Sequence, residues 1–127
     1  MSARTILVTG SSRGIGRALA EALRAAGPIV IGHASAAHDD DTIGADFSDP
    51  LAPDALWDEA LHRAPGGIDV LVNNAGLFQP NPIEAGGLEW LDRWEETLRI
   101  NLTAAARLSR LAVRHWQAAG RGGRIVH

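Results

Sequence analysis

Three residue types that carry much of protein chemistry are missing from this chain of 127 residues: cysteine, tyrosine and lysine. Without cysteine, the chain has no disulfide bond and no thiolate ligand for a metal ion. Its five histidines show no metal-ligand spacing, so we expect no metal site. All twelve basic residues are arginines scattered without a basic run, and we therefore expect no nucleic-acid partner.

Long apolar runs are missing as well. No stretch has the length and hydrophobicity of a membrane-spanning helix, and the N-terminus lacks the charged-then-apolar pattern of a signal peptide. These observations favour a cytoplasmic protein without a membrane partner. The hydrophobic content of 46% and the formal net charge of −3 are typical of one globular domain that buries a core.

The chain does contain a regular alternation of strand and helix patterns. Apolar runs predict strands at 5–9, 29–33, 42–46, 68–73 and from 123 onward, and helical periodicity predicts helices at 15–26, 53–64 and 88–118. Such alternation predicts an α/β fold with a parallel, doubly wound sheet. Residues 34–41 are too few for a helix, so we expect a loop crossover there.

The helical patterns also predict which side chains face the core. The apolar faces consist of Ile15, Ala18, Leu19, Ala22, Leu23 and Ala26 in the first helix, a buried stripe of Leu56, Ala60, Leu61 and Ala64 in the second, and a stripe of Leu91, Trp94, Leu98 and Leu102 in the third. The four tryptophans are expected to be packing residues, with Trp90 or Trp94 near a substrate cleft as the alternative. Pro50 and Pro53, after Ser48 and Asp49, suit a capped start of the second helix.

Three glycines stand where the first strand meets the first helix. Residues 9–16, here called the glycine-rich turn, read T-G-S-S-R-G-I-G. Gly10 permits a tight turn, Gly14 lets the backbone approach a pyrophosphate, and Gly16 lets helix and strand pack closely. The N–H groups at the start of a helix attract anions. The segment therefore predicts a cradle for the phosphates of a dinucleotide, although a glycine-rich turn alone is weak evidence.

A second motif, Asn73-Asn74-Ala75-Gly76, follows the strand Ile68 to Val72 directly. The two asparagines could form a plain turn, because asparagine tolerates left-handed backbone geometry. Asp46 ends another strand, where it could cap a helix. Its place at a carboxyl edge favours the crevice in which open α/β sheets bind their ligands.

With the three glycines, these residues resemble the main subfamily of the short-chain dehydrogenase/reductase superfamily, and within it the 3-oxoacyl-carrier-protein reductases. The likeness runs from Thr5 to His127. It implies an incomplete Rossmann-like sheet of about five strands in the order 3-2-1-4-5. The cofactor-binding positions that it implies are Gly10, Ser12, Arg13, Gly14, Ile15, Gly16, His33, Ser35, Asp46, Asn73, Asn74, Ala75 and Gly76.

The resemblance also implies individual roles. Asp46 matches the acid that meets the adenine ring, and Ile15 and the turn 74–76 would orient the nicotinamide. Asn101 matches the catalytic asparagine, whose backbone holds a water that relays protons to a lysine. Asn101 could instead only bend its helix or form a local hydrogen bond. Residues 122–126 match the entry to the fifth strand.

The second strand has no acid at its end to accept hydrogen bonds from a ribose 2′-hydroxyl. Ser35, and His33 as a further donor, could instead meet a 2′-phosphate, and Arg13 adds a positive charge. The sequence therefore favours NADP(H) over NAD(H). Two alternatives remain: Arg13 is a solvated loop cation, or the acidic run 39–41 folds back over the ribose and reverses the preference.

The sequence departs from the family at one point, because it contains no Tyr-x-x-x-Lys pair. In the family, that tyrosine exchanges the proton at the carbonyl oxygen, and the lysine lowers its pKa. We expect residues 1–127 to be the cofactor-binding half of a longer oxidoreductase, inactive alone, that transfers hydride between NADP(H) and a carbonyl or alcohol substrate. The full-length protein is expected to form a homodimer or homotetramer. The alternative is an inactive NADP(H)-binding or interaction module.

Overall fold

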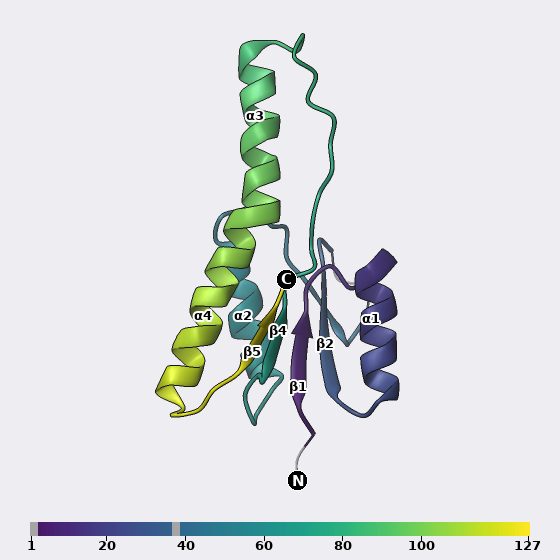
Figure 1. The fold of residues 1–127 in the computed structure, drawn as a ribbon, viewed down its shortest axis with the longest axis vertical. Helices are drawn as coiled ribbons and strands as arrows, with labels where there is room; N and C mark the ends of the chain where they lie inside the picture. The colour runs from purple at the N-terminus through teal and green to yellow at the C-terminus, as the bar shows by residue number, and fades with distance from the viewer. Residues whose placement is uncertain (1–2, 37–38) are drawn as a thin grey trace.

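Five parallel strands form a single sheet in the computed structural model, which describes residues 3–36 and 39–127. The strands are β1 (Thr5–Val8), β2 (Ile29–Ala34), β3 (Thr42–Gly44), β4 (Val70–Val72) and β5 (Arg124–Val126). They lie side by side in the order β3-β2-β1-β4-β5 (Figure 1). Every neighbouring pair is parallel. This arrangement confirms the predicted fold class and strand order.

The register of the central strands brings the carboxyl ends of β1 and β4 to one level, and β2 continues two residues further, to Ala34. Val8 of β1 pairs with Gly32 of β2 on one side and with Val72 of β4 on the other. The segments that leave these three strands therefore start at the same edge of the sheet. Strands β1 and β4 are buried along their whole length, as expected for the interior of a parallel sheet.

Helices cover both faces of the sheet. The described helices are α1 (Gly14–Ala25), α2 (Ala52–His62), α3 (Gly87–Leu98) and α4 (Ala104–Ala118), and the π-helical turn η1 (Arg99–Thr103) joins the last two. Alternate residues of β1 point to opposite faces. Ile6 and Val8 pack toward Ala20 of α1, whereas Leu7 packs into the cluster of α2 and α4. Helix α1 thus covers one face, and α2 and α4 cover the other (Figure 1).

The larger part of the core lies under α2 and α4. Leu56, Trp57 and Ala60 of α2 and Leu108 and Trp116 of α4 are buried there, which confirms the packing role of two tryptophans. Ala64 is buried in the same cluster and Leu61 packs against it, so three positions of the predicted stripe are confirmed as buried and the fourth as half-buried. Outside this core, the guanidinium of Arg107 donates to both carboxylate oxygens of Asp54, with each N–O distance 2.9 Å. The two helices are therefore joined by apolar packing and by a bidentate ion pair.

The apolar face predicted for the first helix is only partly buried. Gly16 and Ala20 are the buried residues of α1, whereas Ile15 is 80% exposed. Ala18, Ala22 and Ala26 are exposed as well, and Leu19 and Leu23 are half-buried. Gly16 explains this rotation, because a Cβ atom there would overlap the Gly10 carbonyl oxygen and the Asn74 side chain. The close approach of backbone to backbone at Gly16 therefore decides which face of α1 meets the sheet.

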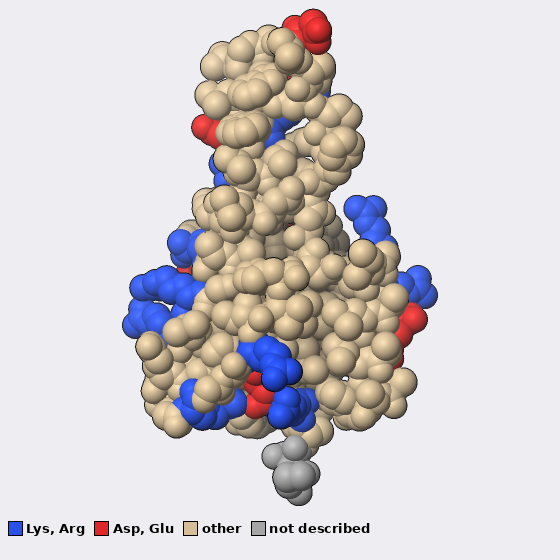
Figure 2. Space-filling model, in the orientation of Figure 1, with Lys and Arg blue, Asp and Glu red and all other residues tan. Residues whose placement is uncertain are grey.

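The apolar stripe expected in the third helix is exposed rather than buried. Leu91, Trp94, Leu98 and Leu102 are between 39% and 61% exposed. Helix α3 extends beyond the carboxyl edge of the sheet, so no strand lies beneath it (Figure 1). Trp90 and Trp94 stack on each other instead, with ring centroids 5.4 Å apart. On the face shown in Figure 2, this projecting end carries few charged side chains, whereas arginines gather on the body below.

The segment before α3 runs along that helix and is hydrogen-bonded to its backbone through side-chain amides. Gln79 donates to the carbonyl oxygen of Arg93, at 3.1 Å, and Asn81 donates to that of Trp90, at 2.9 Å.

The helix predicted at 88–118 is present but is interrupted by η1. No described helix combines the length and apolar character that crossing a membrane requires.

Of two connections predicted in detail, the first agrees with expectation over its described residues and the second differs in its cap. The link from β2 to β3 contains bends and turns but no helix at residues 35–36 and 39–41, and positions 37–38 of the predicted crossover lie outside the described residues. Helix α2 starts with Pro53 in its first turn, as predicted, but Leu51 precedes it without a side-chain cap. The carboxylate of Asp49 accepts the Leu51 N–H two residues on, at 2.9 Å, so it stabilises the preceding turn instead.

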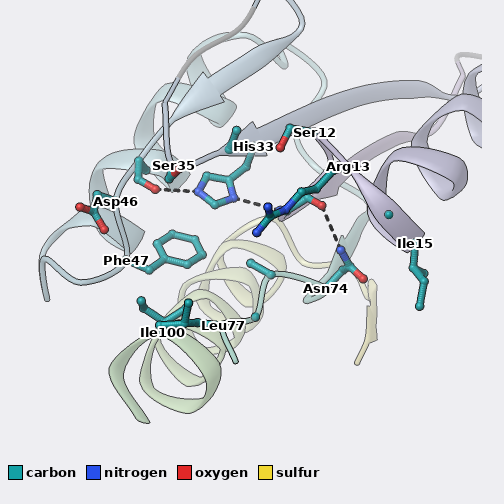
Figure 3. Close-up of a pocket in the computed structure, with 16 residues that line it drawn as sticks. Ser12, Arg13, Ile15, His33, Ser35, Asp46, Phe47, Asn74, Leu77 and Ile100 are labelled. Carbon is teal, nitrogen blue, oxygen red and sulfur yellow. Dashed lines mark hydrogen bonds between the residues drawn. The ribbon is translucent and has the colours of Figure 1, made fainter. Parts of the chain in front are cut away.

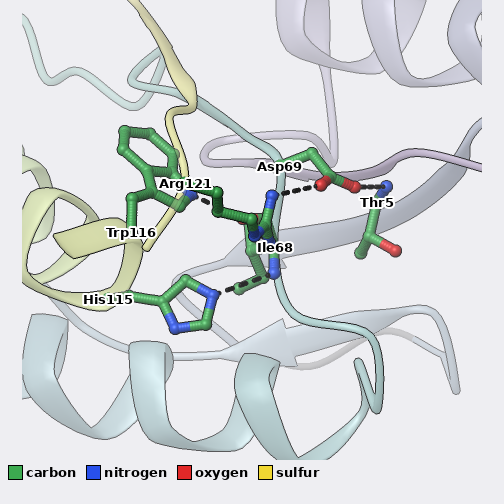
Figure 4. A network of polar contacts seen from close by, with 6 residues as sticks. All are labelled: Thr5, Ile68, Asp69, His115, Trp116 and Arg121. Atoms are coloured by element: carbon green, nitrogen blue, oxygen red, sulfur yellow. Dashed lines mark hydrogen bonds and ion pairs between the residues drawn. The ribbon is translucent and has the colours of Figure 1, made fainter. Parts of the chain in front are cut away.

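Asp69 joins the amino end of the sheet to the turn after α4 (Figure 4). Its carboxylate accepts the Thr5 backbone N–H at 2.7 Å and pairs with the Arg121 guanidinium at 2.6 Å. Partial burial would raise the pKa of Asp69, but the Thr5 hydrogen bond and the Arg121 charge together outweigh burial, so the pKa lies below its ordinary value. Beside it, the Trp116 indole donates to the Ile68 carbonyl at 2.7 Å.

We predict that Asp69→Asn lowers the free energy of unfolding at pH 7 by about 1 kcal/mol, because it removes the charge that faces Arg121. The lowered pKa means that the carboxylate stabilises the fold above its ordinary pKa of about 3.9, and that this contribution is lost as the pH falls through the folded-state value. The difference between variant and parent should therefore shrink in acid. Urea denaturation at several pH values measures it, with Asp58→Asn, at an exposed position of α2, as the control. Equal stability of both variants at pH 7 would contradict the prediction.

Candidate functional site

A pocket of about 760 Å³ opens at the carboxyl edge of the sheet (Figure 3). Five segments build its wall: the glycine-rich turn, the end of β2, the residues after β3, the turn after β4, and η1. The lining residues are Gly10, Ser12, Arg13, Gly14, Ile15, His33, Ala34, Ser35, Ala45, Asp46, Phe47, Asn74, Ala75, Gly76, Leu77 and Ile100. Of the predicted cofactor residues, Gly16 and Asn73 are absent from this wall.

The glycine-rich turn has the backbone geometry that its glycines allow. Gly10 and Gly14 have φ angles of +64° and +59°, which side chains of other residues rarely adopt. A Cβ atom on Gly10 would also lie only 2.8 Å from Cα of Ala75. Arg13, the residue before α1, makes no capping hydrogen bond with its side chain. The first N–H groups of α1 therefore remain available for an anion beside the pocket.

Thr9 and Asn74 tie this turn to the segment that follows β4. The Thr9 hydroxyl oxygen accepts the backbone N–H groups of Asn74, at 3.0 Å, and of Ala75, at 2.9 Å. In return, the Asn74 side-chain amide donates to the carbonyl oxygens of Thr9, at 3.2 Å, and of Gly10, at 3.1 Å. The two turns predicted to bind a cofactor are thus hydrogen-bonded to each other.

His33 connects the glycine-rich turn to the opposite side of the pocket. Its Nδ1 atom accepts the Gly10 N–H at 3.0 Å, and its Nε2 atom lies 2.8 Å from the Ala45 carbonyl oxygen. The ring stacks on Phe47, with centroids 4.3 Å apart and the planes 11° from parallel. Both ring nitrogens are therefore engaged within the protein, so neither is free to donate to a 2′-phosphate in this arrangement.

Burial determines the charge state of His33. The side chain belongs to a residue that is only 3% exposed, and this desolvation lowers the pKa of the imidazole despite the opposing hydrogen bond to Ala45. A carbonyl oxygen can only accept, so Nε2 carries the proton and Nδ1 is bare. His33 is therefore a neutral imidazole of defined tautomer at neutral pH.

Asp46 and Phe47 form the wall beyond β3. The Asp46 carboxylate accepts the Ser48 backbone N–H at 3.0 Å and the Ser48 hydroxyl at 2.8 Å. The backbone hydrogen bond, followed by that of the hydroxyl, lowers the pKa of Asp46, so this side chain stays ionised. Helix α2 begins six residues later, at Ala52, and Asp46 is therefore not its cap. Asp46 instead presents a negative charge at one side of the pocket.

The positive side of the pocket comes from Arg13. Its guanidinium makes no ion pair with any residue of 3–36 and 39–127, and it lines the pocket with Ser12 and Ser35 (Figure 3). The acidic run 39–41 does not line this pocket. The Asp39 carboxylate accepts the Asp41 N–H at 2.9 Å, so it is used within its own turn. Arg13 and the two hydroxyl groups are accordingly the polar side chains beside the end of β2.

Two asparagines lie outside the pocket wall. Asn73 was predicted to bind a cofactor, but its side chain turns away and donates to the Ser109 hydroxyl of α4 at 3.1 Å. Asn101 lies within η1 and pairs with the backbone of Leu77: its Nδ2 donates to the Leu77 carbonyl at 2.8 Å, and its Oδ1 accepts the Leu77 N–H at 2.6 Å. Asn101 thus holds the start of the loop that leads away from the pocket.

Sequence reasoning missed several residues that build the pocket. Phe47, Leu77 and Ile100 line it, and each lies next to a predicted residue or motif, so adjacency was the available signal. Thr9 begins the glycine motif, but nothing in the pattern shows that its hydroxyl meets the second turn. No group of three or more potential metal ligands comes together within the described part of the chain, which does not include His38.

Comparison with known proteins gives a consistent result. The family model for the short chain dehydrogenases matches residues 4–127. A 3-oxoacyl-[acyl-carrier-protein] reductase of Escherichia coli (strain K12) is 36% identical over 131 residues, which cover 94% of this chain and 52% of that protein. A sorbitol dehydrogenase of Cereibacter sphaeroides is 36% identical over 143 residues, covering 100% of this chain and 52% of that protein. The chain thus spans about half the length of these curated relatives.

Solved structures agree in fold. A short-chain dehydrogenase from Streptomyces avermitilis superposes with a TM-score of 0.76 at 36% identity, covering 97% of this chain and 48% of that one. A short-chain dehydrogenase/reductase from Serratia marcescens gives 0.77 at 33% identity, covering 98% and 56%. Since the family model matches nearly the whole chain and the sheet and glycine-rich turn agree with it, this chain belongs to the short-chain dehydrogenase family.

Proposed function

We propose that the pocket binds NADP(H) and that residues 1–127 form the cofactor-binding half of an oxidoreductase. The reaction would be hydride transfer between NADP(H) and a carbonyl or alcohol substrate, similar to that of a 3-oxoacyl-carrier-protein reductase. One observation carries the proposal: the glycine-rich turn, the turn after β4 and the Asp46–Phe47 wall meet around one cavity at the carboxyl edge. Open α/β sheets bind their ligands at this edge.

The residues present fit a dinucleotide. The uncapped N-terminus of α1 and the positive-φ glycines suit the pyrophosphate, which needs close backbone N–H groups. Asp46, whose carboxylate stays ionised, suits the amino group of an adenine ring. At the other end, Ile15 and the turn of Asn74, Ala75 and Gly76 would orient the nicotinamide. The cofactor supplies the hydride, and the contribution of this chain is to bind and orient it.

The proton that accompanies hydride transfer needs groups that this sequence does not contain, because it has neither tyrosine nor lysine. Asn101 is proposed as the asparagine of the relay, with its backbone holding a water. The Leu77 hydrogen bonds already occupy both ends of its side-chain amide. A second candidate is an NADP(H)-binding module without catalysis. The exposed apolar stripe on α3 favours a homo-oligomer for the full-length protein. Its proposed location is the cytoplasm.

Arg13 supports the preference for NADP(H). Its guanidinium has no carboxylate partner among the described residues, and it lines the same pocket as Ser12 and Ser35. A 2′-phosphate would accept hydrogen bonds from all three side chains, and the Arg13 bonds would be charge-assisted. NAD(H) has only a neutral 2′-hydroxyl there, which forms no charge-paired hydrogen bond with Arg13.

We predict that Arg13→Ala weakens the binding of NADPH roughly tenfold and that of NADH much less, because only NADPH loses a charge-assisted hydrogen bond. Titration calorimetry with both nucleotides measures the two affinities. The matched control is Arg17→Ala, one turn along α1, where the arginine is exposed and paired with Glu21. Equal losses for NADPH and NADH would exclude a phosphate-specific role of Arg13.

A second prediction concerns the hydroxyl group of Thr9. Thr9→Val keeps the shape of the side chain but leaves the N–H groups of Asn74 and Ala75 without their acceptor, so the free energy of unfolding should fall by about 2 kcal/mol. NADPH affinity should fall with it, because the two turns lose two of the four hydrogen bonds between them and keep only those of the Asn74 side-chain amide. Thr9→Ser keeps the hydroxyl and should cost below about 1 kcal/mol. If valine and serine behave alike, the hydroxyl is not what joins the two turns.

Turnover separates the two candidate functions. We expect the native gene product, purified from its source cells, to oxidise NADPH when a panel of ketones and 3-oxoacyl thioesters is added, as followed by the loss of nicotinamide absorbance. Its intact mass is measured in the same preparation and compared with 13.4 kDa. Tight binding of NADPH without turnover on the whole panel would favour the binding module.

A further inference from the structure

We propose that His33 is a positioning residue of the nucleotide pocket: its neutral imidazole holds the glycine-rich turn against the opposite wall, and protonation of the ring releases that turn. This inference rests on the proposed binding of NADP(H). It gives His33 a task different from donation to a phosphate, for which its nitrogens are not free.

The imidazole is a bridge between two segments that no strand pairing joins directly. On one side Gly10, at the start of the glycine-rich turn, donates its N–H to Nδ1 at 3.0 Å. On the other side Nε2 donates to the carbonyl oxygen of Ala45 at 2.8 Å, just after β3. Phe47 supports the ring by stacking at a centroid distance of 4.3 Å. The ring therefore sets the spacing between the phosphate side and the Asp46 side of the pocket.

The backbone of His33 holds the next residue of the same turn. Ser11 donates its N–H to the His33 carbonyl oxygen at 2.8 Å, and the His33 N–H donates to the Ser11 hydroxyl oxygen at 3.0 Å. A side chain at Gly32 would overlap that hydroxyl, so the turn lies directly on the end of β2. Because Gly10 and Ser11 are both fixed by His33, the pocket residues that follow them, Ser12 to Gly14, start from a defined position.

Only one protonation state supports this arrangement. Neutral imidazole with its proton on Nε2 can accept from Gly10 and donate to Ala45 at once, whereas the imidazolium would direct an Nδ1–H at the Gly10 N–H. The charged side chains that line the pocket together with the ring come from two segments: Arg13 from the glycine-rich turn and Asp46 from beyond β3. The turn after β4 and η1 contribute Asn74, Leu77 and Ile100, which carry no charge. Acid should therefore break the Gly10 bond.

The linkage to stability has a definite sign. Burial lowers the pKa of His33, so in acid the unfolded chain takes up its proton more readily than the folded chain does. The stability that the neutral ring contributes is complete above the ordinary pKa of about 6.5, and it is lost as the pH falls toward the lower folded-state value. Nucleotide affinity should follow the same direction, because the Gly10 N–H loses its acceptor.

The test is the affinity for NADP⁺ and NAD⁺ between pH 5 and 8, measured by titration calorimetry on the full chain. NAD⁺ is included because it lacks the 2′-phosphate, which titrates in the same range. His33→Phe keeps the stacking on Phe47 but removes both nitrogens, so we expect about three- to tenfold weaker binding of both nucleotides at pH 8. His33→Gln keeps an acceptor and a donor without a titrating group, so it should restore part of the affinity and flatten the fall in acid.

The control is His62→Gln, in the last turn of α2, where the histidine is exposed; it should match the parent throughout. Parental affinities and pH profiles in both His33 variants would overturn the inference and leave the proposed function intact. Failure of the parent itself to bind either nucleotide would overturn both. A measurement on the parent protein also tests the bridge. Nitrogen NMR of the His33 imidazole at pH 8 should show a bare Nδ1 and a protonated Nε2. The opposite tautomer would exclude the proposed bridge.

Discussion

The hydroxyl group of Thr9 is the contact on which the geometry of the pocket depends. It is almost completely buried, accepts the N–H groups of Asn74 and Ala75, and lies 3.4 Å from the Val72 carbonyl oxygen, to which it donates. All of its hydrogen-bonding capacity is thus used at the seam between β1 and β4. Because the two strands end at the same level there, the segments that leave them are neighbours, and the cavity forms between them and the residues that follow β3.

A second set of contacts closes the pocket from the side of β2, and it differs in kind. The Thr9 contacts involve groups that do not titrate near neutrality, whereas the bridge through His33 depends on a single proton. Around it, the pocket separates charge: Arg13 stands at the glycine-rich turn and Asp46 at the far wall. A ligand that carries phosphates at one end and a basic or amino-bearing ring at the other matches this separation.

Much of the fold could be predicted from the sequence, because the buried strands are continuous apolar runs and the helices between them have a clear period. Strand order, the two turns at the carboxyl edge and the helix around Asn101 are all found in the structure. The side-chain assignments were less successful. Periodicity shows that Ile15 or Trp94 lies on an apolar face, but not whether another element covers that face. The bonding of His33 also depends on Ala45 and Phe47, whose positions follow only from how β3 packs beside β2. The contacts of a cofactor with these residues stay predictions.

The π-helical turn η1 has a consequence for the relation between α3 and α4. An α-helix advances by about 100° per residue, and a π-helical turn accommodates one residue more than the α-helical repeat. The faces of α3 are therefore offset from those of α4 by about 100°. Leu108, Ala112 and Trp116 of α4 meet the sheet, and Asn101, within η1 itself, is turned toward Leu77. A chain one residue shorter within 99–103 could continue as a regular α-helix. Its α3, together with the preceding segment 77–86, would then be rotated around the helix axis relative to α4. The additional residue therefore sets the direction in which the side chains of α3 point, without changing how α4 packs on the sheet.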